Sequence, residues 1–172
     1  RAALEEKKDF QPAQRALVRA LDAARDFEAA QKAVDKLAEM GYDATDTALL
    51  RAELRSKQAR YRLQSAGQEV TTELLDSILE QNVAPAIELL SEHADAADKP
   101  AVAQTKLGDT YMLKSQLITR KWNLLREASK TAQNLGNEEQ AATRHANAMA
   151  QLPKIGQAQQ KAREAYQKAI EA

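Results

Sequence analysis

The stretch from Pro100 to Asn134 reads PAVAQTKLGDTYMLKSQLITRKWNLLREASKTAQN, and it decides the fold of this chain. With one charged exception, small and apolar residues recur in it at steps of three, four or seven, which places them on one face of an α-helix. This face comprises Ala103, Thr110, Leu113, Leu117, Arg120, Leu124 and Ala128. Pro100 suits the first helical position, and Asp98 could serve as its cap. The stretch therefore predicts one helix of about 34 residues, roughly 50 Å long.

The composition also favours an all-α fold. Hydrophobic residues make up 44% of the 172 residues, alanine supplies much of that share, and aromatic residues are only 4%. Good helix formers dominate, whereas β-branched and aromatic runs bounded by turn residues are missing, so strands are not expected. At this length we predict a single domain that covers residues 1–172.

Glycine and proline divide the remainder of the chain into further helices. Residues 1–10 could close an earlier helix. The expected elements are a helix from Pro12 to Met40, a helix from about Thr47 to Val83 with a weak point near Gly67, a short helical segment after Pro85, and a last helix that follows Gly136, is capped by Asn137 and is kinked near Pro153 and Gly156. Because short connections join antiparallel neighbours, these elements predict an elongated up-and-down helical bundle of long helices, possibly two stacked four-helix modules.

The charge balance of the chain disfavours binding to nucleic acid or to an anionic membrane surface. The chain has 25 lysine and arginine residues against 25 aspartate and glutamate residues, so no net field attracts nucleic acid or an anionic membrane. It has no cysteine, no run of about eighteen apolar residues and no signal peptide. Since it opens at Arg1 inside a helix-like segment, we expect a fragment of a longer membrane protein whose anchoring segments are absent from this chain.

Enzyme motifs are nearly absent. His93 and His145 are far apart, and neither has the Glu-x-x-His spacing by which helical bundles hold metal ions. The sequence contains neither a glycine-rich phosphate loop nor a Gly-x-Ser-x-Gly elbow. We therefore expect no catalytic residues, no metal and no cofactor.

Arg120 is the most informative candidate for binding, because its neighbours on the helical face are leucines and no acid lies three or four residues away. A charge in that position needs a partner from elsewhere. The partner is either a carboxylate on a facing helix, or solvent reached by extension of the side chain, or an anionic ligand held by the guanidinium. Further donors along the same helix are Thr110, Tyr111, Lys114, Gln116 and Asn123.

Two halves of a tetratricopeptide repeat resemble segments of this chain, LGDTY at 107–111 and AREAYQKAI at 162–170. They do not belong to one repeat unit, because Arg120 replaces the small residue that the repeat needs. A residue count of 34 beyond Gly108 leads to Ala142 rather than to a second glycine. The alternative function that this resemblance implies is a helical protein–protein interaction scaffold, tetratricopeptide-like or coiled-coil-like.

A second resemblance covers more of the chain. Its motifs are GYDAT at 41–45, GQEV at 67–70, LKSQLITRKWNLLREAS at 113–129, the Gly-Asn-Glu-Glu break at 136–139 and AREAYQKAIEA at 162–172. Together with the long alanine-rich helices, these motifs resemble the helical bimodular sensor domain of bacterial chemoreceptors and sensor kinases. In that family, stacked four-helix bundles outside the inner membrane hold small organic acids between helices through arginines.

This resemblance implies a periplasmic, homodimeric, ligand-sensing domain that binds a small organic acid and meets the membrane only through flanking segments. It supports Arg120 as a ligand arginine and Arg126 as a weaker second one. Arg55 and Arg60 resemble the arginine-rich helices of such domains, although a solvated basic face is the simpler interpretation of that segment. The chain is shorter than the full six-helix domain of the family.

Overall fold

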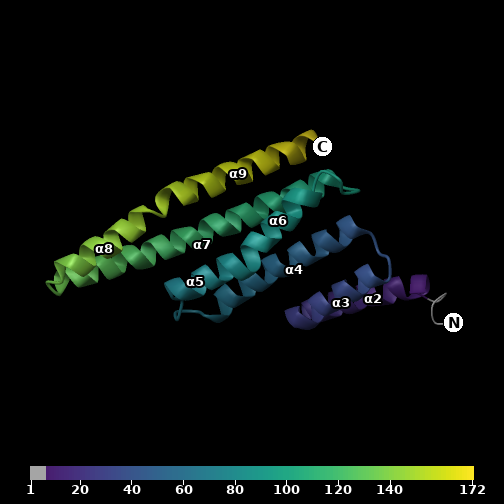
Figure 1. The fold of residues 1–172 in the computed structure, drawn as a ribbon, viewed down its shortest axis with the longest axis horizontal. Helices are drawn as coiled ribbons and strands as arrows, with labels where there is room; N and C mark the ends of the chain where they lie inside the picture. Colours follow the sequence, from purple (N-terminus) through teal and green to yellow (C-terminus); the bar gives the residue numbers. More distant parts are fainter. Residues whose placement is uncertain (1–6) are drawn as a thin grey trace.

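The computed structural model describes residues 7–172, with side chains from residue 10 onward, and these residues form helices and short turns (Figure 1). The elements are α2 (Lys7–Ala23), α3 (Phe27–Glu39), α4 (Ala44–Ser65), α5 (Thr72–Ile78), the π-helical turn η1 (Leu79–Val83), α6 (Ala84–His93), α7 (Pro100–Asn134), α8 (Glu138–Met149) and α9 (Leu152–Glu171). The all-α prediction is confirmed. The finer prediction of two stacked four-helix modules stays a prediction.

The long helix predicted from Pro100 to Asn134 is present as α7, with the bounds that the sequence indicated. It packs against α8 and α9 on one side and against α6, α5, η1 and α4 on the other, so it links the two parts of the molecule (Figure 1). The expected cap at Asp98 is wrong. Lys99 occupies the cap position without a side-chain hydrogen bond, and Pro100 lies in the first turn, where no backbone donor is needed.

The helix predicted from Pro12 to Met40 is wrong, because the chain reverses between Ala23 and Phe27. Arg25 adopts a left-handed conformation with φ 62°, and the Asp26 side chain then caps α3 by accepting a hydrogen bond from Ala29 N at 3.1 Å. The expected new start at Pro12 is also wrong, since α2 runs through it. The expected helix end over residues 1–10 lies largely outside the described residues.

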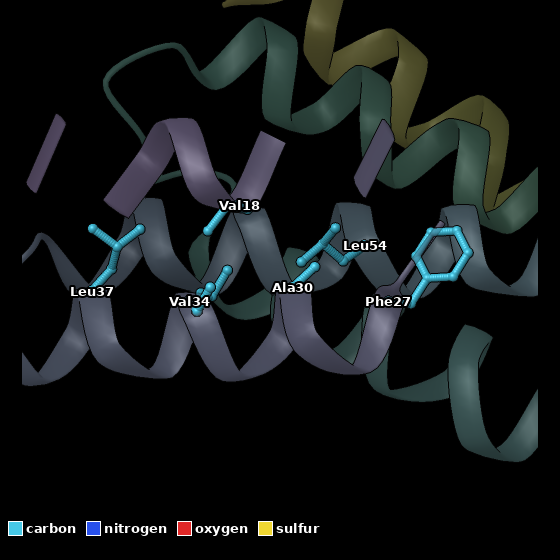
Figure 2. Packing of buried hydrophobic residues seen from close by; sticks show 7 residues of the cluster. Val18, Phe27, Ala30, Val34, Leu37 and Leu54 are labelled. Carbon is cyan, nitrogen blue, oxygen red and sulfur yellow. The ribbon is translucent and has the colours of Figure 1, made fainter. Parts of the chain in front are cut away.

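The hairpin formed by α2 and α3 packs on α4 through an apolar cluster. Figure 2 shows side chains of all three helices gathered between them. The buried members of this cluster are Val18, Phe27, Ala30, Ala33, Val34, Leu37 and Leu54. Burial of this apolar face is what holds two short helices against the rest of the molecule.

The helix predicted from Thr47 to Val83 is also divided, at the weak point that the sequence indicated. Gly67 has φ +52° and follows the end of α4, and four residues later the Thr71 side chain caps α5 by accepting from Leu74 N at 3.2 Å. Pro85 does not end the following segment. It lies in the first turn of α6, directly after η1, so its missing backbone donor is tolerated.

The C-terminal helices follow the predicted signals in part. Gly136 is left-handed with φ 73°, and Asn137 caps α8 by accepting from Gln140 N at 3.3 Å, which confirms both assignments. The expected kink is instead a full break between Met149 and Leu152, and Pro153 opens α9. None of the described helices is both long and apolar enough to cross a membrane.

Candidate functional site

Arg120 does not face the core. Its side chain is exposed, and its Nη2 donates a hydrogen bond to the Gly67 carbonyl at 3.1 Å. Because Gly67 lies just beyond the end of α4, its carbonyl has no partner within the helix, and a long arginine side chain on α7 can reach it. Of the partners left open for Arg120 by the sequence, the structure fits extension of the side chain to the surface, and its contact ties the segment after α4 to α7.

Arg126 and Arg55 also have partners other than a ligand site. The Arg126 guanidinium lies 4.8 Å from the Trp122 ring centroid, and its Nη2 is 3.5 Å from Glu127 Oε1, all on α7 itself. The Arg55 Nη1 donates to the Gln81 carbonyl of η1 at 3.0 Å. Arg55 thus supports the π-helical turn, where the backbone hydrogen-bonding pattern changes.

The remaining four candidates line two separate hollows on different sides of α7. Tyr111 and Lys114 line the first, whereas Thr110 and Arg60 line the second. We call the first the lysine groove and the second the central cleft. The seven candidates predicted from the sequence therefore do not converge on one site.

The lysine groove lies between α7 and α9 and has a volume of about 340 Å³. Its lining residues are Tyr111, Lys114 and Ile118 from α7, and Lys154, Gln157, Ala158 and Lys161 from α9. Small residues on α9, of which Ala158 and Ala162 are buried, allow the two helices to pack closely and bring their lysines to a shared hollow. The contribution of α9 was not predicted, although its lysines recur every seven residues at 154, 161 and 168.

The groove is locally electropositive although the chain is neutral. The hydrogen bond and charge of Glu164, 3.0 Å from Lys161 Nζ, raise the pKa of Lys161, so that lysine is already paired. Among the side chains described, no carboxylate lies within 4 Å of the Lys114 or Lys154 ammonium. Lys154 also lies in the first turn of α9, whose N-terminus carries partial positive charge. The arrangement suits an anion.

The central cleft lies between α4, α6 and α7 and has a volume of about 190 Å³. It is lined by Glu53, Ser56, Lys57 and Arg60 of α4, Leu90 of α6, and Lys106, Asp109 and Thr110 of α7. Its floor is a buried hydrogen bond between the Ser56 and Thr110 hydroxyls at 3.2 Å. Since Thr110 Oγ1 donates to the Lys106 carbonyl at 2.8 Å, Ser56 is the donor of this pair.

Charges in the central cleft are largely paired. Lys57 Nζ lies 2.6 Å from Asp22 Oδ2 and 2.9 Å from Glu53 Oε1, and Lys106 binds the second oxygen of Glu53. Burial raises the pKa of Glu53, but hydrogen bonds from Lys106 and Lys57 outweigh burial and leave that pKa below its usual value. Glu53 is therefore an ionised carboxylate held by two lysines.

Asp109 has a different kind of partner. The Tyr166 hydroxyl of α9 donates to Asp109 Oδ1 at 2.8 Å, and burial followed by this hydrogen bond raises the pKa of Tyr166 to about 12. The Tyr166 ring packs directly over Gly108, where a Cβ would lie 2.5 Å from Cε1 of the ring. Gly108 is thus the position at which the Tyr166 ring of α9 packs against the backbone of α7.

No group of acidic, histidine or cysteine residues that could hold a metal ion occurs in the part of the chain that the structure describes. The chain matches no protein-family model, no curated protein and no solved structure.

Proposed function

We propose that this chain is the extracytoplasmic ligand-sensing domain of a chemoreceptor-like signal transducer, and that it binds a small organic acid in the lysine groove. The observation that carries the proposal is a hollow between two long helices into which three lysines converge, with no acidic residue in its lining. A receptor is chosen because the sequence motifs at 41–45, 67–70, 113–129, 136–139 and 162–172 resemble those of sensor domains.

A carboxylate suits this groove for electrostatic reasons. Lys114 on α7 and Lys154 on α9 are ammonium groups that can each bind one carboxylate oxygen or one end of a dicarboxylate. A charge pair in a hollow of reduced dielectric is stronger than the same pair in open solvent. The proposal moves the ligand site from Arg120 and Arg126, which have other partners, to Tyr111 and Lys114 together with the lysines of α9.

The same geometry suggests how binding would be transmitted. A ligand that bridges Lys114 and Lys154 changes the relative position of α7 and α9, and packed helices shift as rigid bodies. In a homodimer, such a shift would be passed to membrane segments that flank this domain. Periplasmic location, the dimer and the flanking segments are parts of this proposal that rest on the resemblance.

The test is a thermal-shift and calorimetric titration with acetate, dicarboxylates, tricarboxylates and aromatic acids. We expect at least one acid to raise the melting temperature, since a ligand that binds only the folded state stabilises it by RT ln(1 + [L]/Kd). The double variant K114A/K154A should lose this rise, and added salt should weaken it.

The matched control is K36A, which removes an exposed lysine from α3 on the far side of the bundle (Figure 1). It should bind the acid as the parent does. Equal binding by K114A/K154A and by the parent would place the acid elsewhere and overturn the assignment of the groove.

The exposure of Arg120 favours a second candidate, the helical interaction scaffold. An arginine that binds a backbone carbonyl between two helices is structural, and it needs no small ligand. For a scaffold we expect no response to any acid in the panel, and the same melting temperature for the parent and for K114A/K154A.

A further inference from the structure

The central cleft differs from the lysine groove because charges of both signs line it. Three cations, Lys57, Arg60 and Lys106, line it together with the carboxylates of Glu53 and Asp109. Lys57 also binds Asp22, which lies outside the lining. A simple anion therefore gains little from the net charge of this cleft, whereas a molecule with both signs of charge can match it.

Two of these charged groups, Arg60 and Asp109, can still bind a charged ligand. Glu53 is occupied by both lysines, and Lys57 by two acids. Among the side chains described, no carboxylate lies within 4 Å of the Arg60 guanidinium, and the only recorded partner of Asp109 there is the Tyr166 hydroxyl on Oδ1. Arg60 and Asp109 are both exposed at the mouth of the cleft.

Arg60 and Asp109 both line this cleft, one from α4 and the other from α7. The positive charge of Arg60 is close enough to Tyr166 to act on its pKa in the lowering direction, against the burial and the Asp109 contact that raise it. Tyr166 in turn holds Asp109 in place at 2.8 Å. A guanidinium on α4 and a carboxylate on α7 thus border one small hollow.

We propose that the central cleft binds a small zwitterion, an α-amino acid, with its carboxylate on Arg60 and its ammonium on Asp109. Arginine presents two parallel donors to a carboxylate, and an aspartate accepts from an ammonium through its free oxygen. The buried Leu90 side chain offers an apolar wall to a short side chain. The volume of about 190 Å³ lies below the range of about 300–1,000 Å³ typical of sites for drug-sized ligands, so only a small amino acid fits.

This site is independent of the organic-acid site proposed above, because it uses the α4 side of α7. The test is calorimetric titration of the full chain with glycine, L-alanine and L-serine, and with acetate and methylamine as the two halves of the zwitterion. We expect an amino acid to bind at least tenfold more tightly than either half, since only the whole molecule satisfies both Arg60 and Asp109.

The variants R60Q and D109N should each weaken amino-acid binding at least tenfold. Both are expected to fold, because Arg60 is exposed and the asparagine amide oxygen can still accept from Tyr166; far-UV circular dichroism checks this. R60K provides a second test that keeps the charge and loses the two-pronged geometry, so it should bind with intermediate affinity.

The groove variant K114A/K154A is the control that separates the two sites, and it should bind the amino acid as the parent does. The proposal is overturned if none of the amino acids binds, if acetate binds as tightly as alanine, or if R60Q and D109N both bind like the parent. Loss of binding in K114A/K154A with full binding in R60Q would assign the amino acid to the lysine groove instead.

Discussion

The two halves of α7 share one helical pattern but are buried in different ways. In the central half, residues 100–118, large side chains are buried against α4, α5, α6, η1 and α9; they are Leu107, Leu113, Leu117 and Ile118. In the outer half, residues 119–134, the buried residues are Ser129 and Ala132, and the buried residues of the adjacent helix α8 are also small, Ala141 and Ala148. A periodic pattern thus predicts a helix along the whole stretch, whereas the size of the buried residues decides where the stability lies.

In the outer half of α7, polar contacts with α8 partly replace the missing burial of large apolar side chains. Ser129 Oγ donates to the Ala141 carbonyl at 2.7 Å, and Arg144 Nη1 donates to the Ala128 carbonyl at 3.0 Å. Such bonds contribute about 0.5–1.5 kcal/mol each, less than a fully buried leucine. We therefore expect the α7–α8 end to open locally before the centre of the molecule does.

The largest expected effect is the difference in stability between a leucine-to-alanine substitution in the central half of α7 and one in the outer half. Leu117→Ala removes a side chain that is 0% exposed and should lower the free energy of unfolding by about 2–5 kcal/mol, through lost burial and a cavity. Leu125→Ala, at a half-buried position of the outer half, should cost about 1 kcal/mol. Urea unfolding of both variants measures the difference. Equal costs would show that the two halves are packed alike.

A smaller effect is expected at the contact between Gly108 and Tyr166. Gly108→Ala places a Cβ 2.5 Å from the ring, so the Tyr166 ring or α9 must shift, at a cost of about 1–3 kcal/mol. Gly156→Ala is the matched control, because nothing lies within 4 Å of its Cβ and alanine favours a helix by about 0.5–1 kcal/mol.

The double variant G108A/Y166A sharpens this test. Once the ring is absent, alanine at position 108 should no longer destabilise the protein relative to Y166A alone. A cost that persists without the ring would assign the effect of Gly108→Ala to another contact.

The Tyr166 contact also predicts a dependence on pH. Its pKa is raised from 10.0 to about 12 in the folded state, so the protonated form is favoured by folding. The contribution of Tyr166 is therefore fully present below pH 10 and is lost as the pH rises from 10 to 12. Thermal melts across this range should fall less steeply for Tyr166→Phe than for the parent. Tyr42, whose pKa burial also raises, accounts for a remaining slope.

The smallest expected effect is that of Arg120→Ala. Its hydrogen bond to Gly67 is exposed, so we expect a loss of less than about 1 kcal/mol in the free energy of unfolding and no change in binding of an organic acid to the lysine groove. Loss of acid binding in this variant would show that Arg120 is a ligand residue. It would contradict the assignment of the organic acid to the lysine groove alone.

The sequence predicted those parts of the fold that local chemistry determines. The long α7 follows from its periodicity, and the weak point at Gly67 and the stop at Gly136 follow from the freedom of glycine to adopt positive φ. The reversal at Arg25 could not be predicted, because an arginine in a left-handed conformation carries no such local signature. It depends on contacts made after folding, including the Arg25 guanidinium 5.0 Å from the Tyr61 ring centroid.

The sites were less predictable, because both hollows are formed by helices distant in sequence. Tyr111, Lys114, Thr110 and Arg60 were named from the sequence, but nothing local indicated that α7 divides them between two sides. Lys154 lies 40 residues beyond Lys114, and its place beside it depends on the packing of α9 on α7. For Arg120 the sequence left several partners open, because a helical face that is apolar on average does not exclude a long side chain that bends toward a free carbonyl.

The continuity of α7 gives it the properties of a lever. The central cleft and the lysine groove both meet this helix between Lys106 and Ile118, and its 35 residues run on without interruption to Asn134. At about 1.5 Å per residue, a rotation of 1° about Thr110 moves Asn134 by about 0.6 Å. A tilt too small to break any contact at either hollow would therefore be magnified at the far tip of the helix.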